Sequence, residues 1–179
     1  SINIIRKRLP CKEEFAVIIT AMRANHLTTP LGYDLSHLGL SWIPEDANGT
    51  RQETARVVIA SDRDFTHILH DSGSRADLDS LGYCPGVALS PRTRYYWSVT
   101  VRDETGDEAS GVSWFETGKA GEPWQARWIS PDCGSIHPLV RGAFTLPEKP
   151  VQARAYVCGF GLYECYANGT RVGDEYFTP

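Results

Sequence analysis

The segment from Thr93 to Arg102 places the strongest constraint on the fold, because its side chains alternate between apolar and polar. One face carries the apolar side chains and the other carries the polar ones: Tyr95, Trp97, Val99 and Val101 against Arg94, Ser98, Thr100 and Arg102. Such alternation predicts an antiparallel strand with one face buried. A turn over 103–107 and a returning strand over 112–117 would complete a hairpin.

Further short strands are predicted upstream of this hairpin, and helical periodicity is nearly absent. Residues 40–43 and 55–60 are short apolar runs, and Asn48-Gly49 lies between them. An Asn-Gly pair tolerates the positive φ of a two-residue hairpin turn. Short strands at this spacing predict a β-sandwich.

The pattern changes after residues 118–123, whose composition is that of a linker. Strands are predicted for the aromatic or alternating runs that follow, at 124–131, 139–146, 151–157 and 162–167. Asn168-Gly169 would then turn the chain into a last strand over 170–172. Both Asn-Gly-Thr sequences also match glycosylation acceptors, but only the hairpin turn explains the glycine that follows each asparagine.

Charge and length exclude several partners. The 179 residues carry a net charge of −4, with 41% hydrophobic and 22% charged residues, which is enough for a packed core. Basic residues are scattered, which argues against nucleic acid. The apolar run at 15–19 is far too short to span a membrane and lacks a signal-peptide cleavage pattern. Five cysteines at irregular spacing indicate free thiols in a reducing compartment, which favours the cytoplasm.

Several motifs occur together in one order: ANHLTTPLGYDLSHLGLSW, SPRTRYYWSVTVRDETG, WFETG, WQARWISP, LVRGAFTLP and ARAYVCGFGLYECYANGTRVGDE. This set resembles the N-terminal region of bacterial α-L-rhamnosidases, the inverting glycoside hydrolases of family 78. Residues 15–118 also resemble a fibronectin type III domain, with Tyr95 as its corner tyrosine and Trp42 in its core. The resemblance implies a fibronectin-like or immunoglobulin-like module before a jelly-roll-type β-domain, with the catalytic (α/α)6 barrel later in the enzyme.

The resulting expectation is an all-β chain: a fibronectin type III or immunoglobulin-like β-sandwich followed by part of a jelly-roll-type β-domain. Its expected parts are an extension (1–14), the sandwich (15–118), a linker (119–123) and a truncated second domain (124–179). The chain would then be a fragment whose partner is the rest of the parent enzyme. A truncated domain exposes an apolar face, so self-association is also expected.

No catalytic pair is expected in this chain. Inverting hydrolysis needs two carboxyl groups about 6.5–9.5 Å apart. The acidic candidates Glu164, Asp174 and Glu175 show no sign of converging on one site. His67 and His70 have a spacing that could suggest a metal pair, but a zinc site needs three or four ligands. Neither a metal nor a cofactor is therefore expected.

Sugar binding is the functional alternative to a purely structural role. Candidate sugar contacts are Trp124, Trp128, Tyr163, Glu164 and Tyr166, because sugars are held by aromatic platforms and a few polar groups. The ordinary interpretation of these rings, together with Phe160 and Tyr176, is core and inter-domain packing. Three hypotheses follow: non-catalytic modules of a rhamnosidase, an independent carbohydrate-binding module with a rhamnose-containing glycan as candidate ligand, and a structural spacer or adhesion β-sandwich.

Overall fold

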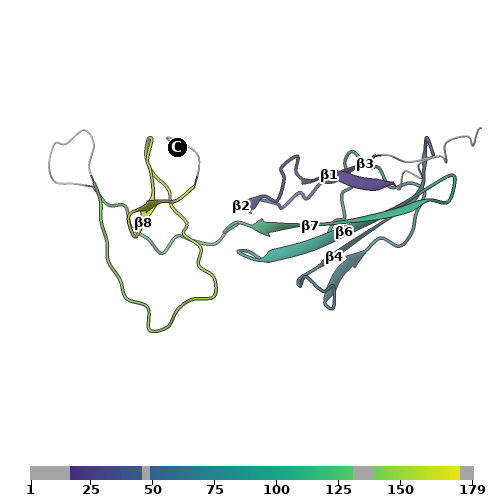
Figure 1. Cartoon of the computed structure of the whole chain (residues 1–179). Helices are drawn as coiled ribbons and strands as arrows, with labels where there is room; N and C mark the ends of the chain where they lie inside the picture. The colour runs from purple at the N-terminus through teal and green to yellow at the C-terminus, as the bar shows by residue number, and fades with distance from the viewer. Residues whose placement is uncertain (1–16, 46–48, 131–138, 174–179) are drawn as a thin grey trace, which may run out of the picture. The chain divides into compact units, whose positions relative to one another are not determined.

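The computed structural model describes residues 17–45, 49–130 and 139–173 (Figure 1). The chain divides into two compact units, Ser1–Ala126 and Arg127–Pro179, and each is described by itself. Every regular element of the described residues is a β-strand, as the sequence predicts. None of these residues forms a helix long and apolar enough to cross a membrane.

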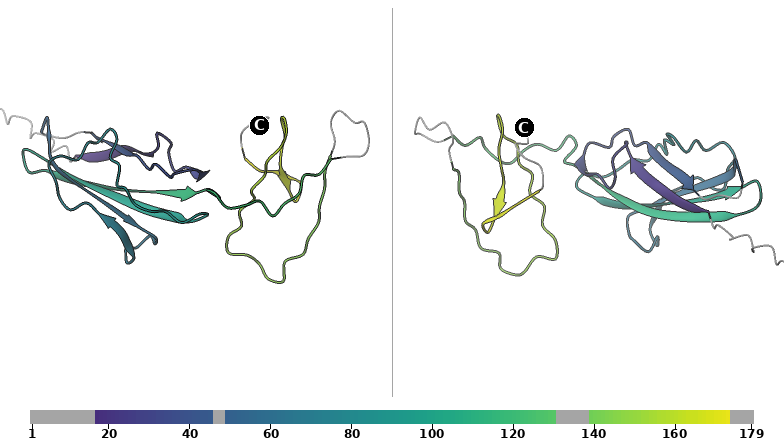
Figure 2. Two further views of the ribbon diagram at one scale, coloured as in Figure 1. Left: turned by 180° about the vertical axis from the view of Figure 1, so that it is seen from behind. Right: turned by 45° about the horizontal axis from the view of Figure 1, so that its top comes forward.

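The first unit is a sandwich of two sheets (Figures 1 and 2). Its strands are β1 (Ile18–Ala24), β2 (Leu31–Tyr33), β3 (Leu40–Glu45), β4 (Gln52–Ala60), β5 (Ile68–Asp71), β6 (Arg94–Asp103) and β7 (Glu108–Thr117). The larger sheet has the order β2-β7-β6-β4-β5, and β1 pairs with β3 in the smaller one. All pairs are antiparallel except β2 with β7, which is parallel.

Strand β6 lies at the centre of the larger sheet and confirms the predicted alternation. Its residues pair with β4 on one side and with β7 on the other. The four apolar side chains of the predicted inner face are each at most 2% exposed: Tyr95, Trp97, Val99 and Val101. A strand with two neighbours and one buried face is strongly specified in register, since a slip by one residue would expose all four.

The core fills the space between the two sheets. Trp42 of β3 is 1% exposed and packs into the same cluster as Trp97 and Phe115 of the larger sheet, which confirms its predicted core position. Residues 80–83 lie beside β3 and extend the smaller sheet by a third segment. Leu40 and Tyr83 exchange two backbone hydrogen bonds at 2.8 Å. Apolar alternation is weak in this segment, so the sequence did not predict it.

The predicted corner tyrosine makes the contact expected of it. The Tyr95 hydroxyl oxygen accepts a hydrogen bond from the backbone N–H of Ser90, five residues upstream, at 2.8 Å. A tyrosine hydroxyl bonded a few residues upstream is a hallmark of immunoglobulin-like sandwiches. The bond fixes the loop that enters β6 and leaves the ring itself buried against Phe115, with centroids 5.6 Å apart.

The second unit contains one short hairpin in its described residues, β8 (Tyr166–Ala167) with β9 (Thr170–Arg171). Asn168 and Gly169 have φ of 51° and 81°, so the predicted turn is confirmed. Asn48 of the other predicted turn lies outside the described residues. The predicted strands at 124–131, 139–146 and 151–157 are wrong, because the described residues of these runs form none. An alternating run becomes a strand only when a neighbour takes its N–H and C=O groups, and these runs have no paired neighbour.

Candidate functional site

Trp124 is the one candidate sugar contact that belongs to the first unit. It is 52% exposed, and the Lys119 ammonium lies 5.1 Å from the centroid of its ring. A cation at this distance over an indole ring makes a weakly attractive cation–π contact at an exposed site. The Trp124 ring thus lies at the surface against the Lys119 side chain and is not packed into the core.

The other four candidates lie in the second unit, where the structure forms two separate local contacts. Trp128 stacks on Phe160 with centroids 4.4 Å apart, and the Tyr166 hydroxyl donates to Glu164 Oε2 at 2.8 Å. The ring of Tyr163 lies against Gly159, where an added Cβ would come within 2.7 Å of it. Each of these three contacts joins a different pair of residues.

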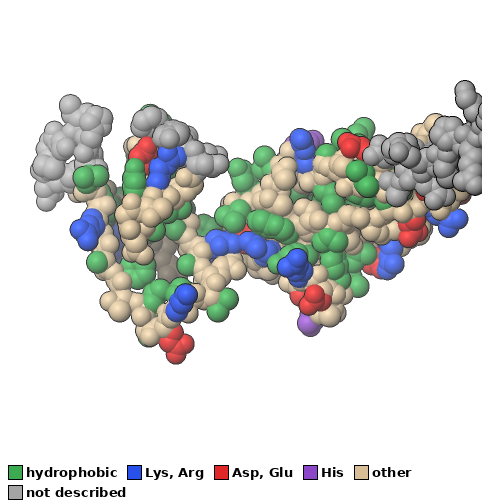
Figure 3. Space-filling view, viewed as in Figure 1, with side chains coloured by type: hydrophobic (Ala, Val, Ile, Leu, Met, Phe, Trp, Pro, Cys, Tyr) green, Lys and Arg blue, Asp and Glu red, His purple; other side chains and the backbone are tan. Residues whose placement is uncertain are grey.

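Several of the described aromatic rings of the second unit are exposed. Trp128 is 65% exposed, Phe160 is 90% and Tyr166 is 57%, so these three rings are not buried within the second unit. Hydrophobic side chains lie openly on the surface of the unit (Figure 3). The physical reason is the same as for the missing strands: rings are buried by a second layer, and the described residues of the second unit supply one short hairpin, β8–β9. Asp174, Glu175 and Tyr176 lie outside the described residues.

His67 and His70 each contact a different neighbouring side chain. His67 Nδ1 lies 3.2 Å from Asp62 Oδ2, whereas His70 Nε2 lies 2.8 Å from the Tyr83 hydroxyl. Burial lowers the pKa of His70. Within the described part of the chain, no group of three or more His, Cys, Asp and Glu side chains could hold a metal ion. The described cysteines, Cys84, Cys158 and Cys165, are free thiols.

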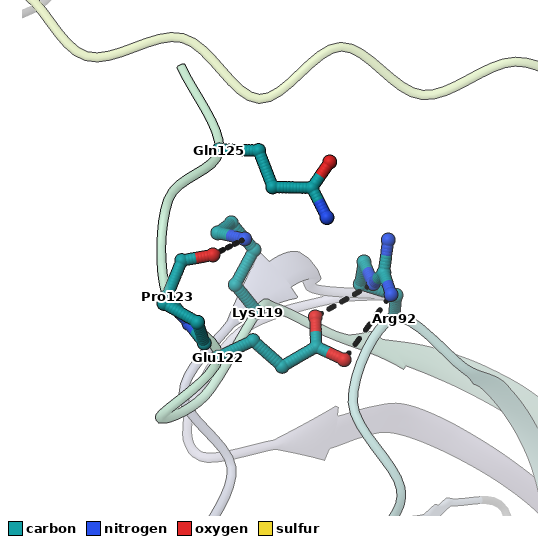
Figure 4. A pocket seen from close by; sticks show the side chains of 5 residues that line it. All are labelled: Arg92, Lys119, Glu122, Pro123 and Gln125. Carbon is teal, nitrogen blue, oxygen red and sulfur yellow. Dashed lines mark hydrogen bonds and ion pairs between the residues drawn. The ribbon is translucent and has the colours of Figure 1, made fainter. Parts of the chain in front are cut away.

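A polar concavity of about 250 Å³ lies in the first unit, next to the end of β7. It is lined by Arg92, Lys119, Glu122, Pro123 and Gln125 (Figure 4). The sequence assigned residues 119–123 to a linker and so missed this feature. Arg92 and Glu122 are 30 residues apart, and nothing in either local sequence indicates that they meet.

Two carboxylates at the β6–β7 turn hold the loop that precedes β4. Asp103 Oδ2 accepts from the Gly49 N–H, and Glu104 accepts from the N–H groups of Thr50 and Arg51, each at 2.8 Å. These bonds favour the charged form of both carboxyls. The pKa of Glu104 falls to about 2, chiefly through the Thr50 N–H, and that of Asp103 is lowered, chiefly through the Thr105 hydroxyl.

The hydrogen bonds of Glu104 to the loop before β4 predict a loss of stability in acid. The folded-state pKa of Glu104 lies below the unfolded value of about 4.3. Its contribution is therefore complete above that value and is lost as the pH falls toward 2. We expect the thermal midpoint to drop between about pH 4.5 and 2, and Glu104→Gln to flatten part of the drop. Thermal unfolding followed by circular dichroism at several pH values across this range measures the midpoint of both proteins. Glu108→Gln, on β7, removes the same charge away from the loop, and an equal flattening there would contradict the assignment.

Two family models match the chain in succession. A model described as "Rha78A-like, N-terminal immunoglobulin domain" matches residues 19–121. A model described as "Alpha-L-rhamnosidase N-terminal domain" matches residues 148–179. The two matches do not overlap, and the first coincides with the sandwich of the first unit.

Curated relatives give the same assignment. An α-L-rhamnosidase of Streptomyces avermitilis is 41% identical over 122 residues, which is 64% of this chain and 12% of that enzyme. An α-L-rhamnosidase of Formosa agariphila is 25% identical over 207 residues, covering 94% of this chain and 22% of that enzyme. The chain thus spans 12% to 22% of the length of these relatives.

Solved structures resemble this chain over about two thirds of its length. The crystal structure of Streptomyces avermitilis α-L-rhamnosidase complexed with L-rhamnose aligns with a TM-score of 0.55 and 35% identity, over 64% of this chain and 12% of that one. The α-L-rhamnosidase from Dictyoglumus thermophilum aligns with a TM-score of 0.56 and 25% identity, over 66% and 14%.

Proposed function

Because the chain belongs to the Rha78A-like N-terminal immunoglobulin domain family and is homologous to the N-terminal region of α-L-rhamnosidases, we propose that it is the non-catalytic part of such an enzyme. In this proposal the whole enzyme removes terminal α-L-rhamnose from glycosides with inversion. The catalytic residues would lie in the rest of that enzyme, which is the partner of this chain.

The succession of the two family matches is the observation that carries the proposal. An immunoglobulin domain at 19–121 and a rhamnosidase N-terminal domain at 148–179 account for most of the chain without any catalytic domain. The small share of the relatives' length that the chain covers supports the same conclusion. In this proposal the sandwich and the domain that follows it would help to position and stabilise the catalytic domain.

Glycan binding is a second candidate function, and the exposed rings of the second unit favour it. Trp128 and Phe160 stack with an interplanar angle of 29° and leave most of their area open to solvent. Exposed flat rings of this kind suit the apolar face of a sugar, whereas the Glu164–Tyr166 pair offers polar groups. A rhamnose-containing glycan would be the ligand.

The non-catalytic assignment is tested with the chain alone on 4-nitrophenyl α-L-rhamnopyranoside. We expect no release of 4-nitrophenol above the blank, because both family models that match the chain describe N-terminal domains of α-L-rhamnosidases. The Streptomyces avermitilis enzyme serves as the positive control in the same buffer. Turnover by this chain would overturn the assignment, and a catalytic pair would then have to be sought within it.

A further inference from the structure

We infer that residues 118–124, here named the exit strap, form an ordered extension of the first unit, fixed by an ion pair between Arg92 and Glu122. Composition alone predicts a flexible linker here. The structure instead assigns these residues to the first unit, which extends to Ala126. The inference concerns this chain by itself and is independent of the proposed function.

The backbone is held where the strap leaves β7. Gly118 donates its N–H to the Tyr33 carbonyl at 2.8 Å, and its own carbonyl accepts from the Arg92 N–H at 2.9 Å. One residue earlier, the Thr117 hydroxyl donates to the Ser90 carbonyl at 2.7 Å. Gly118, the first residue of the exit strap, is therefore held by the end of β2 and by the loop that precedes β6.

Side chains hold the rest of the strap (Figure 4). The Arg92 guanidinium donates twice to the Glu122 carboxylate, from Nε to Oε2 at 2.8 Å and from Nη2 to Oε1 at 3.1 Å. Such a fork-shaped pair restricts orientation as well as distance. A turn brings Glu122 into place, since its N–H donates to the Lys119 carbonyl at 3.0 Å. The Lys119 ammonium in turn donates to the Pro123 carbonyl at 3.3 Å and lies over the Trp124 ring.

The backbone of Arg92 gives independent support. Its φ is 50°, a left-handed conformation that is unfavourable for a residue with a long side chain and natural for glycine. Pro91 precedes it, so the loop is a tight turn in which glycine would be the favoured residue at this place. The ion pair with Glu122 explains why an arginine occupies this position in place of glycine.

The test separates the order of the strap from the stability of the sandwich. Arg92→Gly relieves the backbone strain and removes the ion pair, so the thermal midpoint should stay the same or rise. Trypsin cleavage after Lys119 should nevertheless become about two- to fivefold faster, the range given by an exposed ion pair. Glu122→Gln leaves the loop untouched and should accelerate the same cleavage. Mass spectrometry resolves this cut from all others.

A matched control and a rescue complete the design. Arg102→Ala breaks another exposed ion pair of the same sandwich, that with Glu53 at 3.6 Å, and should leave cleavage after Lys119 unchanged. The charge-swapped Arg92→Glu/Glu122→Arg variant should restore slow cleavage. The inference is overturned if wild-type chain is cut there as fast as an unstructured peptide of the same sequence. It is equally overturned if Arg92→Gly and Glu122→Gln are both cut at the wild-type rate.

Discussion

Replacing Trp97 with alanine is expected to reduce the free energy of unfolding of the sandwich by about 3–5 kcal/mol. Trp97 is 0% exposed and lies on β6 between Ile59 of β4 and Ser113 of β7. Removing the indole leaves a cavity that paired strands on both sides cannot close. Because a domain of this size is stable by only about 5–15 kcal/mol, this loss is a large share of its total stability. Urea denaturation followed by far-ultraviolet circular dichroism measures the loss.

Two companion variants show whether burial is the cause. Val112→Ala changes a side chain that is 60% exposed on β7 and should reduce stability by less than about 1 kcal/mol. Trp97→Phe should be milder than alanine, since the ring largely fills the space and the buried indole N–H has no hydrogen-bond partner to lose. Equal losses for Trp97→Ala and Val112→Ala would contradict the location of the core.

Gly118→Ala is expected to reduce the free energy of unfolding by about 3 kcal/mol, at the upper end of overpacking effects. An added Cβ would collide with the carbonyl oxygen of Gly32 and lie 2.9 Å from its carbonyl carbon. Both obstacles are backbone atoms, so no rotamer change can relieve the collision. The parallel contact between β2 and β7 would have to open, and amide hydrogen exchange at Tyr33 and Gly118 should accelerate together with the loss of stability.

Gly82→Ala is the matched control for this substitution. An added Cβ at Gly82 meets no atom within 4 Å, so the variant should differ from wild type by about 0.5 kcal/mol or less. If Gly118→Ala proves as stable as Gly82→Ala, the close approach of β2 to the end of β7 is not the constraint that the structure indicates.

The sandwich could be predicted from sequence because its strands carry their own signal. The alternation in β6 reflects one buried and one exposed face, and the turn residues between β6 and β7 limit the register. Trp42 and Tyr95 were predictable as well, since each occupies a position that the sandwich requires. Local pattern and three-dimensional contact agree in these elements.

Apart from the Asn168-Gly169 turn, the second unit could not be predicted in the same way, and neither could the polar concavity. The runs at 139–146 and 151–157 have strand-like composition, but pairing depends on neighbours that a local pattern does not contain. Likewise, the pairing of Arg92 with Glu122 depends on how the strap folds back, and both residues look like ordinary surface charges. Exposed candidates such as Trp128 and Tyr166 were selected by residue type, and residue type does not show whether they converge.

One titration tests the central claim most directly: amide NMR spectra of the whole chain with increasing 4-nitrophenyl α-L-rhamnopyranoside, with product measured in the same sample. A non-catalytic N-terminal region predicts no 4-nitrophenol and unmoved amides throughout the sandwich. Shifts confined to residues near Trp128 and Tyr166 would add glycan binding to that role. Release of 4-nitrophenol by this chain would contradict the account.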